Sequence, residues 1–167
     1  ADMSTVEAFY TIVATVSLTE DEDAENDSFE VEIQHLNPID TGVTAMISPT
    51  SGVLLSSAEV VTVEITNFGG ATLTDFEITH EVDGELVTEI VPGPLEGNST
   101  MEYTFTQTVD LSTPGNYIVS AFTNTDGDAN TDNDIFETQV INSNCAPSMN
   151  CGVGDGLQLF QLLDINN

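Results

Sequence analysis

The chain contains no lysine and no arginine. Its 167 residues include 29 acidic residues, which gives a formal net charge of −29 at pH 7. No salt bridge to a lysine or arginine can form within it, so repulsion between its carboxylates must be screened by salt, bound cations or protonation. Binding to nucleic acid depends on lysine and arginine contacts to phosphates. The composition therefore argues against nucleic acids and anionic membranes as partners and favours a salty, cation-rich exterior.

The same absence removes every cleavage site for a trypsin-like protease. Selection for protease resistance outside a cell explains this composition. Compositional drift in a marine or salt-adapted organism explains it equally well, and both interpretations stay open.

Long apolar runs are also absent. No run approaches the roughly 18 apolar residues of a membrane helix, and the first residues do not read as a charged, apolar signal sequence. We expect a soluble segment without membrane insertion, with any export signal outside it. The 40% content of hydrophobic residues is too high for a disordered acidic tail and is enough for the core of one domain.

Cysteine is scarce, and the two cysteines lie close together at Cys145 and Cys151. With no histidine nearby and no second pair, this spacing makes a poor zinc site and predicts a small disulfide loop. A bond from Cys145 to a cysteine beyond residue 167 is the main alternative.

No segment has a helical period, and short alternating stretches separated by turn residues fill residues 41–140. The pattern predicts an all-β fold, an immunoglobulin-like antiparallel β-sandwich in tandem repeats. The expected strands lie at 43–48, 59–67, 75–82, 85–91, around 101–105, 117–123 and 134–140.

Alternation also predicts which side chains face the core. The strand at 59–67 places its valines and Ile65 on one face, and Asp83-Gly84 reads as a two-residue hairpin turn. The inward residues expected before and after that turn are Phe76, Ile78, His80 and Val82, then Leu86, Thr88 and Ile90.

The sequence repeats itself at an interval of one domain. Residues 2–5 recur at 110–113, Tyr10 recurs as Tyr117, and residues 26–30 recur at 133–137. We therefore predict that residues 1–36 are the C-terminal strands of a preceding immunoglobulin-like repeat, paired as a hairpin. Residues 37–143 are expected to form a complete domain, and residues 144–167 to start a further β domain. Either the segment was cut from a longer protein, or the hairpin finds its partner in a neighbouring chain.

An acidic loop before the last expected strand is the candidate metal site. Calcium binds six to eight oxygens, and alternating Asp and Asn around a glycine can supply them. The alternative is that these side chains only tighten a turn by bonding their own backbone. The tentative calcium ligands are Asp126, Asp128, Asn130, Asp132 and Asp134, with Asp21, Asp23 and Asp27 in the preceding repeat.

Four elements, at 48–52, 59–63, 110–117 and 128–133, resemble the CARDB family of bacterial cell-adhesion-related domains over residues 39–143. A shorter stretch at 145–156 is similar to the start of a GEVED-like domain. The resemblance implies an extracellular spacer or adhesive module of a large surface protein, including adhesion and gliding proteins of the type IX pathway. It supplies no catalytic residues.

Catalysis is not indicated by the residues themselves. His35 lies in a linker and His80 on an inward-facing strand, and neither has metal or triad spacing. We expect a non-enzymatic structural or adhesive repeat, exposed at the cell surface, with neighbouring repeats and a surface glycan or protein as partners. The alternatives are an accessory domain of a secreted hydrolase and a filament subunit that assembles by strand complementation.

Overall fold

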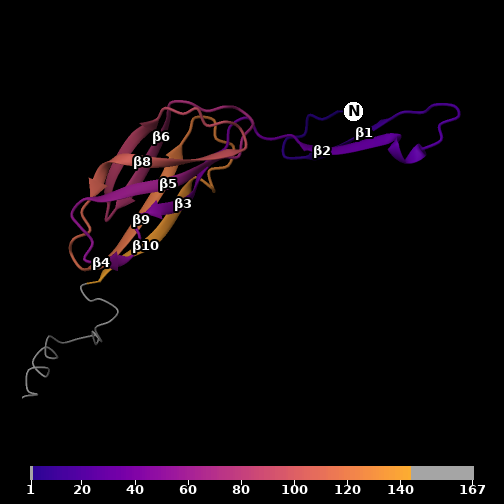
Figure 1. The fold of residues 1–167 in the computed structure, drawn as a ribbon. Helices are drawn as coiled ribbons and strands as arrows, with labels where there is room; N and C mark the ends of the chain where they lie inside the picture. Colours follow the sequence, from indigo (N-terminus) through magenta and orange to yellow (C-terminus); the bar gives the residue numbers. More distant parts are fainter. Residues whose placement is uncertain (1, 144–167) are drawn as a thin grey trace, which may run out of the picture.

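The computed structural model describes residues 2–143, which form a hairpin and a β-sandwich (Figure 1). The hairpin consists of β1 (Phe9–Thr15) and β2 (Ser28–Gln34), with one 3₁₀ turn at Ala24–Asn26 between them. Within the described residues, no helix is long and apolar enough to cross a membrane. The sandwich strands are β3 (Thr41–Ser48), β4 (Gly52–Val53), β5 (Glu59–Asn67), β6 (Phe76–Val82), β7 (Glu85–Val91), β8 (Ser99–Val109), β9 (Gly115–Asn124) and β10 (Ile135–Ser143).

Two sheets pack face to face in the sandwich. One has the strand order β4-β10-β9-β6-β7 and the other has the order β3-β5-β8. All neighbours are antiparallel except β4, which pairs in parallel with β10. The predicted all-β, immunoglobulin-like sandwich is confirmed. The strand that the sequence did not indicate is β4, because two residues are too few to show an alternating pattern.

The core follows the predicted alternation on β5 and β6. Val61, Val63 and Ile65 are completely buried, as is Ile78 on the opposing sheet. Burial of each such side chain contributes roughly 1.5–3 kcal/mol relative to exposure. The apolar stripe of each sheet therefore holds the two layers together.

The expected inward face of β7 is wrong. Leu86 and Ile90 are 60% and 49% exposed, whereas Val91 is fully buried. The turn at Asp83 and Gly84, with φ of 51° and 87°, has the type I′ geometry that pairs the residues flanking it directly. Directly paired residues share a face of the sheet. The inward side of β7 therefore consists of the partners of the inward residues of β6, namely Glu85, Val87, Glu89 and Val91.

The β1–β2 hairpin has the same register as β9–β10. Tyr10 pairs with Ile33 as Tyr117 pairs with Val140, and the remaining pairs keep that shift of 107 residues along both strands. The predicted hairpin over residues 1–36 is therefore present. Its strands coincide, residue for residue, with the last two strands of the complete domain.

A tyrosine corner also occurs in both copies. The Tyr10 hydroxyl donates to the Thr5 carbonyl oxygen at 3.1 Å, and the Tyr117 hydroxyl donates to the Thr113 carbonyl oxygen at 2.6 Å. The sequence repeat therefore encodes the same local structure in both places, although only the second copy has a sandwich beneath it.

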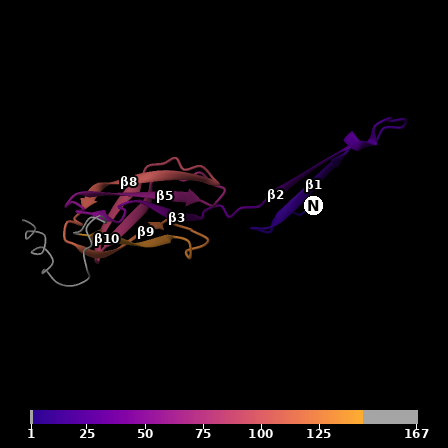
Figure 2. The same ribbon diagram turned by 60° about the horizontal axis from the view of Figure 1, so that its bottom comes forward.

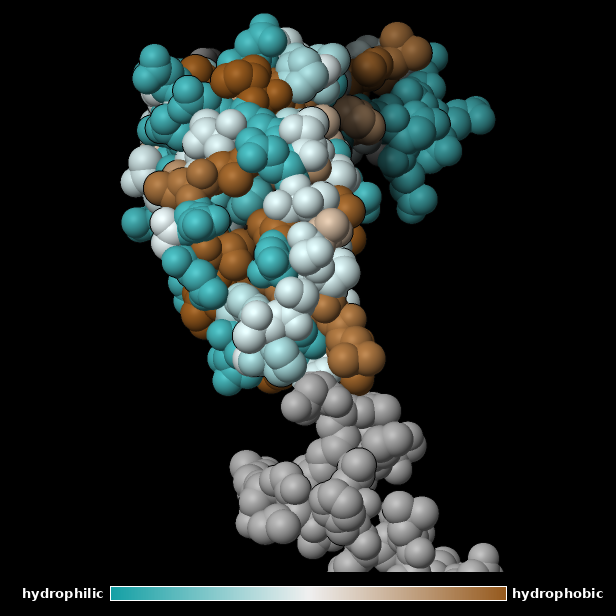
Figure 3. All heavy atoms as spheres, turned by 90° about the vertical axis from the view of Figure 1, so that its left-hand side faces the viewer, coloured by the Kyte–Doolittle hydropathy of each residue, from teal (hydrophilic) through white to brown (hydrophobic). Residues whose placement is uncertain are grey.

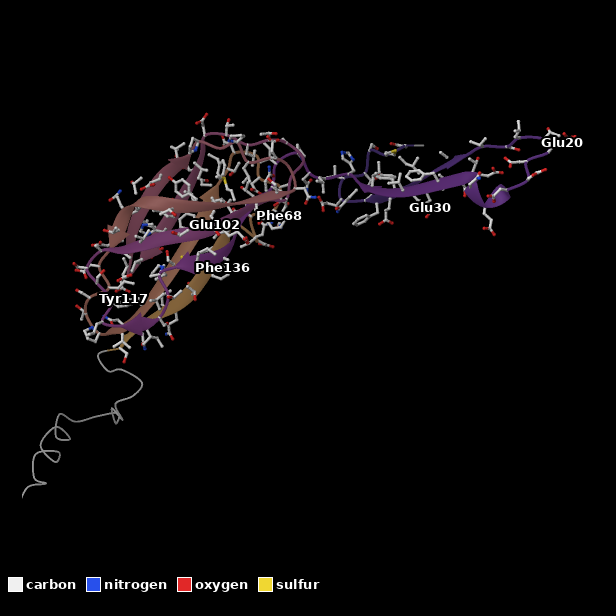
Figure 4. All side chains as sticks on the ribbon, in the orientation of Figure 1. Glu20, Glu30, Phe68, Glu102, Tyr117 and Phe136 are labelled. Carbon is white, nitrogen blue, oxygen red and sulfur yellow. The ribbon has the colours of Figure 1, made fainter. Side chains whose placement is uncertain are left out.

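The hairpin projects from one end of the sandwich, away from both sheets (Figures 1 and 2). In Figure 4, Phe68 lies beside the junction, and Tyr117 lies at the opposite end of the sandwich. The hairpin face that corresponds to the inner face of β9–β10 carries exposed apolar side chains, including Ile12 at 43% and Phe29 at 67% exposure. In the complete domain, the equivalent residues Val119 and Phe136 pack in or against the core.

Hydrogen bonds hold the linker between the hairpin and the sandwich at both ends. On the hairpin side, Glu7 Oε1 accepts from the backbone nitrogen and Nδ2 of Asn37, at 3.2 and 3.0 Å. On the sandwich side, the backbone nitrogens of Gly70 and Ala71 donate to Asn37 and Pro38, at 2.7 and 2.9 Å. The linker is therefore a bonded strap and not a free tether.

Candidate functional site

The acidic loop between β9 and β10 closes onto the first residues of the sandwich. Asp128 Oδ2 accepts from the Thr41 backbone nitrogen at 2.8 Å and from the Thr41 hydroxyl at 3.0 Å. Asn133 Nδ2 donates to Asp40 Oδ1 at 2.8 Å, and the Ala129 backbone nitrogen donates to the Ile39 carbonyl oxygen at 3.1 Å. These contacts join segments more than 80 residues apart in the sequence and fix the loop to the linker.

Other side chains of the loop bond the backbone of the loop itself. Asp128 Oδ1 accepts from the Asn130 nitrogen at 2.9 Å, and Asn130 Oδ1 accepts from the Asp132 nitrogen at 3.4 Å. Gly127 adopts φ of 81°, which only a residue without a Cβ atom adopts freely. Much of the polar composition is therefore used in turn formation, as the alternative to calcium binding expected.

The tentative calcium ligands do not converge on one point. Asp126 borders a cavity beside Asp75 and Glu77 instead. Nowhere in residues 2–143 does a group of three or more His, Cys, Asp or Glu side chains have a geometry that could hold a metal ion. The acidic residues whose charges do interact are Asp128, Asp134 and Asp40, and Asp40 lies outside the set read from the sequence.

In the first repeat, the tentative ligands also bond the backbone. Asp21 Oδ1 accepts from the Asp23 nitrogen at 3.0 Å, and Asp23 Oδ1 accepts from the Glu25 nitrogen at 3.2 Å as the N-cap of the 3₁₀ turn. The carbonyl oxygen of Asp27 accepts from the Val16 nitrogen at 2.8 Å. Cys145 and Cys151 lie outside the described residues.

Asp134 is the electrostatically strained member of the loop. Burial raises the pKa of its carboxyl group, and the nearby charges of Asp128 and Asp40 raise it further, against a hydrogen bond from Thr123 that lowers it. Its Oδ1 atom and the Oδ1 atom of Asn133 are buried without a hydrogen-bond partner. At neutral pH, the ionised carboxylate is therefore held where a neutral group is favoured.

We expect Asp134→Asn to stabilise the domain at pH 7, by no more than about 1 kcal/mol after solvent screening. A group whose pKa is raised by folding stabilises the fold while it is protonated, and that contribution is lost as the pH rises through the folded-state pKa. The gain should therefore disappear near pH 3, where Asp134 is protonated in both states. Urea unfolding at the two pH values measures it.

The matched control is Asp132→Asn, which removes the same charge from an exposed position in the same loop. An equal gain from both substitutions would mean that relief of the overall net charge, and not the local environment of Asp134, causes the effect.

A second carboxylate, Glu89, connects the two sheets at their edge. Its Oε2 atom accepts from the Tyr103 hydroxyl at 2.8 Å, and its Oε1 atom accepts from the Thr106 nitrogen at 2.9 Å and the Thr106 hydroxyl at 2.6 Å. The Gln107 nitrogen donates to it at 3.3 Å. Sequence reasoning missed this residue because it placed the wrong face of β7 inward.

A family model named CARDB matches residues 39–144, which is more than half of the chain. The chain belongs to the CARDB family. This confirms the resemblance drawn from the motifs at 48–52, 59–63, 110–117 and 128–133, all of which lie within the match. The stretch that resembles a GEVED-like domain lies outside it.

Two solved structures of a CARDB domain are similar to this one. Both are of the PF1109 protein from Pyrococcus furiosus. The solution NMR structure has 15% identity and a TM-score of 0.49, covering 65% of this chain and 99% of that one. The crystal structure, a complex with di-metal ions, has 18% identity and a TM-score of 0.46, covering 65% and 98%. No curated protein matches the chain.

CARDB is a structural domain family, and the histidines of this CARDB domain fit that description. His35 is exposed in the linker, where its backbone nitrogen donates to the Ala8 carbonyl oxygen at 3.0 Å. His80 is 1% exposed, and its ring has no hydrogen-bond partner. Neither side chain is paired with a nucleophile or a carboxylate in the manner of a catalytic group.

Proposed function

We propose that this chain is part of a tandem array of CARDB repeats that acts as a spacer in an exported surface protein. The observation that carries the proposal is the register shared by β1–β2 and β9–β10, together with their shared tyrosine corners. Residues 1–36 are then the end of a preceding repeat. The hydrogen-bonded linker favours an array whose repeats are held in a defined relation, as a spacer requires.

The proposed location is the cell surface, and the proposed partners are neighbouring repeats and a glycan or protein bound by the array. The absence of lysine and arginine supports exposure to salt and to trypsin-like proteases. Adhesion and export by the type IX pathway belong to the same proposal, in which this chain has a mechanical and not a catalytic role.

The experiment supplies the strands that the hairpin lacks. A copy of residues 37–109 is placed before Asp2 of the full chain, so that residues 2–36 become the last strands of a hybrid repeat. Native-state hydrogen exchange is compared with that of the unextended chain. We expect the amides of β1 and β2 to be weakly protected alone and protected in the extended chain, because the added sheet covers Ile12 and Phe29.

Unchanged, rapid exchange of β1 and β2 in the extended chain would contradict the proposal. Strand complementation between chains makes the opposite prediction for the unextended chain. There, the hairpin amides should become protected as protein concentration and polymer size rise, which light scattering measures on the same samples.

Calcium binding stays a prediction for the acidic loop. Its support is the mutual repulsion of Asp40, Asp128 and Asp134 and the unpartnered Oδ1 atoms of Asn133 and Asp134. A ligand that binds only the folded state at a hundredfold excess over its Kd stabilises by about 2.7 kcal/mol. Thermal unfolding in EDTA and in millimolar calcium at matched ionic strength should then differ by several degrees. Coincident curves would leave the loop as a turn and linker clamp only.

A further inference from the structure

A cavity of about 480 Å³ lies at the end of the sandwich away from the hairpin. β6 begins near the linker residue Ile39 and runs away from it to Val82. The β6–β7 turn forms one wall of the cavity, and the last residues of β8 form the other. The molecule is drawn from this side in Figure 3, where hydrophobic residues are scattered among hydrophilic ones.

The deepest polar group of the cavity is His80. It lines the cavity and is 1% exposed, and neither Nδ1 nor Nε2 has a hydrogen-bond partner. Its ring packs edge-on against Phe105, with the ring centroids 4.6 Å apart. A neutral imidazole has one donor and one acceptor nitrogen, and leaving either unpaired on burial is costly. Burial lowers the pKa of His80, against an opposing effect of Glu89, so the ring is neutral at pH 7 and its acceptor nitrogen is available.

Three exposed carboxylates, of Asp83, Glu85 and Asp110, surround this group. The chain has no lysine or arginine that could neutralise them. Their field raises the local concentration of cations and repels anions. A bare metal ion is not favoured, because residues 2–143 contain no group of three or more potential ligands in a suitable geometry.

Apolar side chains cover the remaining surface. Val82, Val87 and Val109 line the cavity between the carboxylates and the core. A ligand that satisfies the whole lining must therefore combine an apolar stem, N–H donors and a positive charge.

We propose that this cavity binds an organic cation that carries an ammonium or guanidinium group on an apolar stem. The stem contacts the three valines, one N–H group donates to the free nitrogen of His80, and the others donate to Glu85 and Asp110. A guanidinium group suits this lining well because it has five donors and no acceptor. The cation is either a free amine or the lysine or arginine side chain of a partner protein. The proposal is independent of the array function.

The chain has two histidines, so the imidazole Cε1–Hε1 NMR spectrum gives one reporter in the cavity and one internal reference, His35. The full chain is titrated at constant ionic strength with n-butylguanidinium and, separately, with a blocked Gly-Arg-Gly peptide. We expect a saturable shift of the His80 signal and no saturable shift of the His35 signal. A peptide that binds as well as the small cation indicates a partner side chain, and weaker binding of the peptide indicates a free amine.

Glu85→Gln removes a rim charge and should weaken binding about two- to fivefold. The matched control is Glu81→Gln, which removes the same charge from a residue that follows His80 on β6 and does not line the cavity. It should leave the affinity within the error of the titration. Equal weakening by both variants, or a parallel non-saturating drift of both histidine signals, would overturn the proposal in favour of diffuse attraction to an acidic protein.

Discussion

Replacement of Glu89 by alanine is expected to destabilise the sandwich by about 2 kcal/mol and to lower its Tm by roughly 10 °C. The carboxylate accepts hydrogen bonds from Tyr103, Thr106 and Gln107 on the facing sheet. Truncation leaves those donors without their acceptor at an edge where no strand pairs β7 with β8. Urea unfolding measures the loss.

The pH dependence of this loss has a definite sign. Burial raises the pKa of Glu89, but the hydrogen bonds from Thr106, Tyr103 and Gln107 outweigh it and leave the pKa below its usual value. Such a group stabilises the fold above its unfolded-state pKa, and the contribution disappears as the pH falls through the folded-state value. The difference between the wild type and the alanine variant should therefore shrink at acidic pH.

Tyr103 gives a second reading of the same contact. Burial and the neighbouring Glu89 carboxylate raise the pKa of Tyr103 to about 12. In the alanine variant, this pKa should move toward 10, as followed by phenolate absorbance. Glu102→Ala is the matched control, because Glu102 is an exposed glutamate of β8, labelled in Figure 4. It should change stability by less than about 0.5 kcal/mol. Equal effects of both substitutions would show that Glu89 does not join the sheets.

The same residue explains where sequence reasoning failed. On β5, alternation located the core correctly because the apolar residues all lie on one face and polar residues on the other. On β7, Leu86 and Ile90 face solvent while Glu89 faces the other sheet, so hydrophobicity alone predicts the opposite phase. Only the direct pairing imposed by the turn at Asp83 and Gly84 reveals the true one.

The acidic loop was also only partly predictable. Its composition identified a turn rich in Asp and Asn, and the structure contains that turn. The groups that bind its side chains, Asp40 and Thr41, lie more than 80 residues earlier, and no local pattern connects them to Asp128 and Asn133. The hairpin, by contrast, was predictable because a repeated sequence encodes a repeated register.

Replacement of Gly42 by alanine is expected to destabilise the domain by about 2–3 kcal/mol. A Cβ atom at this position would overlap the backbone carbonyl oxygen of Asn133 and would lie 2.9 Å from its carbonyl carbon. That backbone cannot easily move, because Asn133 Nδ2 is bonded to Asp40 and the Asp134 carbonyl oxygen accepts from Val43 at 3.3 Å. The clash is steric, between β3 and the acidic loop.

The matched control for this substitution is Gly115→Ala. Nothing lies within 4 Å of a Cβ atom at Gly115, so alanine there should change stability by less than about 0.5 kcal/mol or stabilise slightly. Relief of the clash at position 42 requires the loop to leave the linker, so the amides of Thr41 and Ala129 should lose hydrogen-exchange protection in Gly42→Ala. If the two glycine variants were equally stable and equally protected, the loop would not clamp the linker, and the relation between successive repeats would have to be set elsewhere.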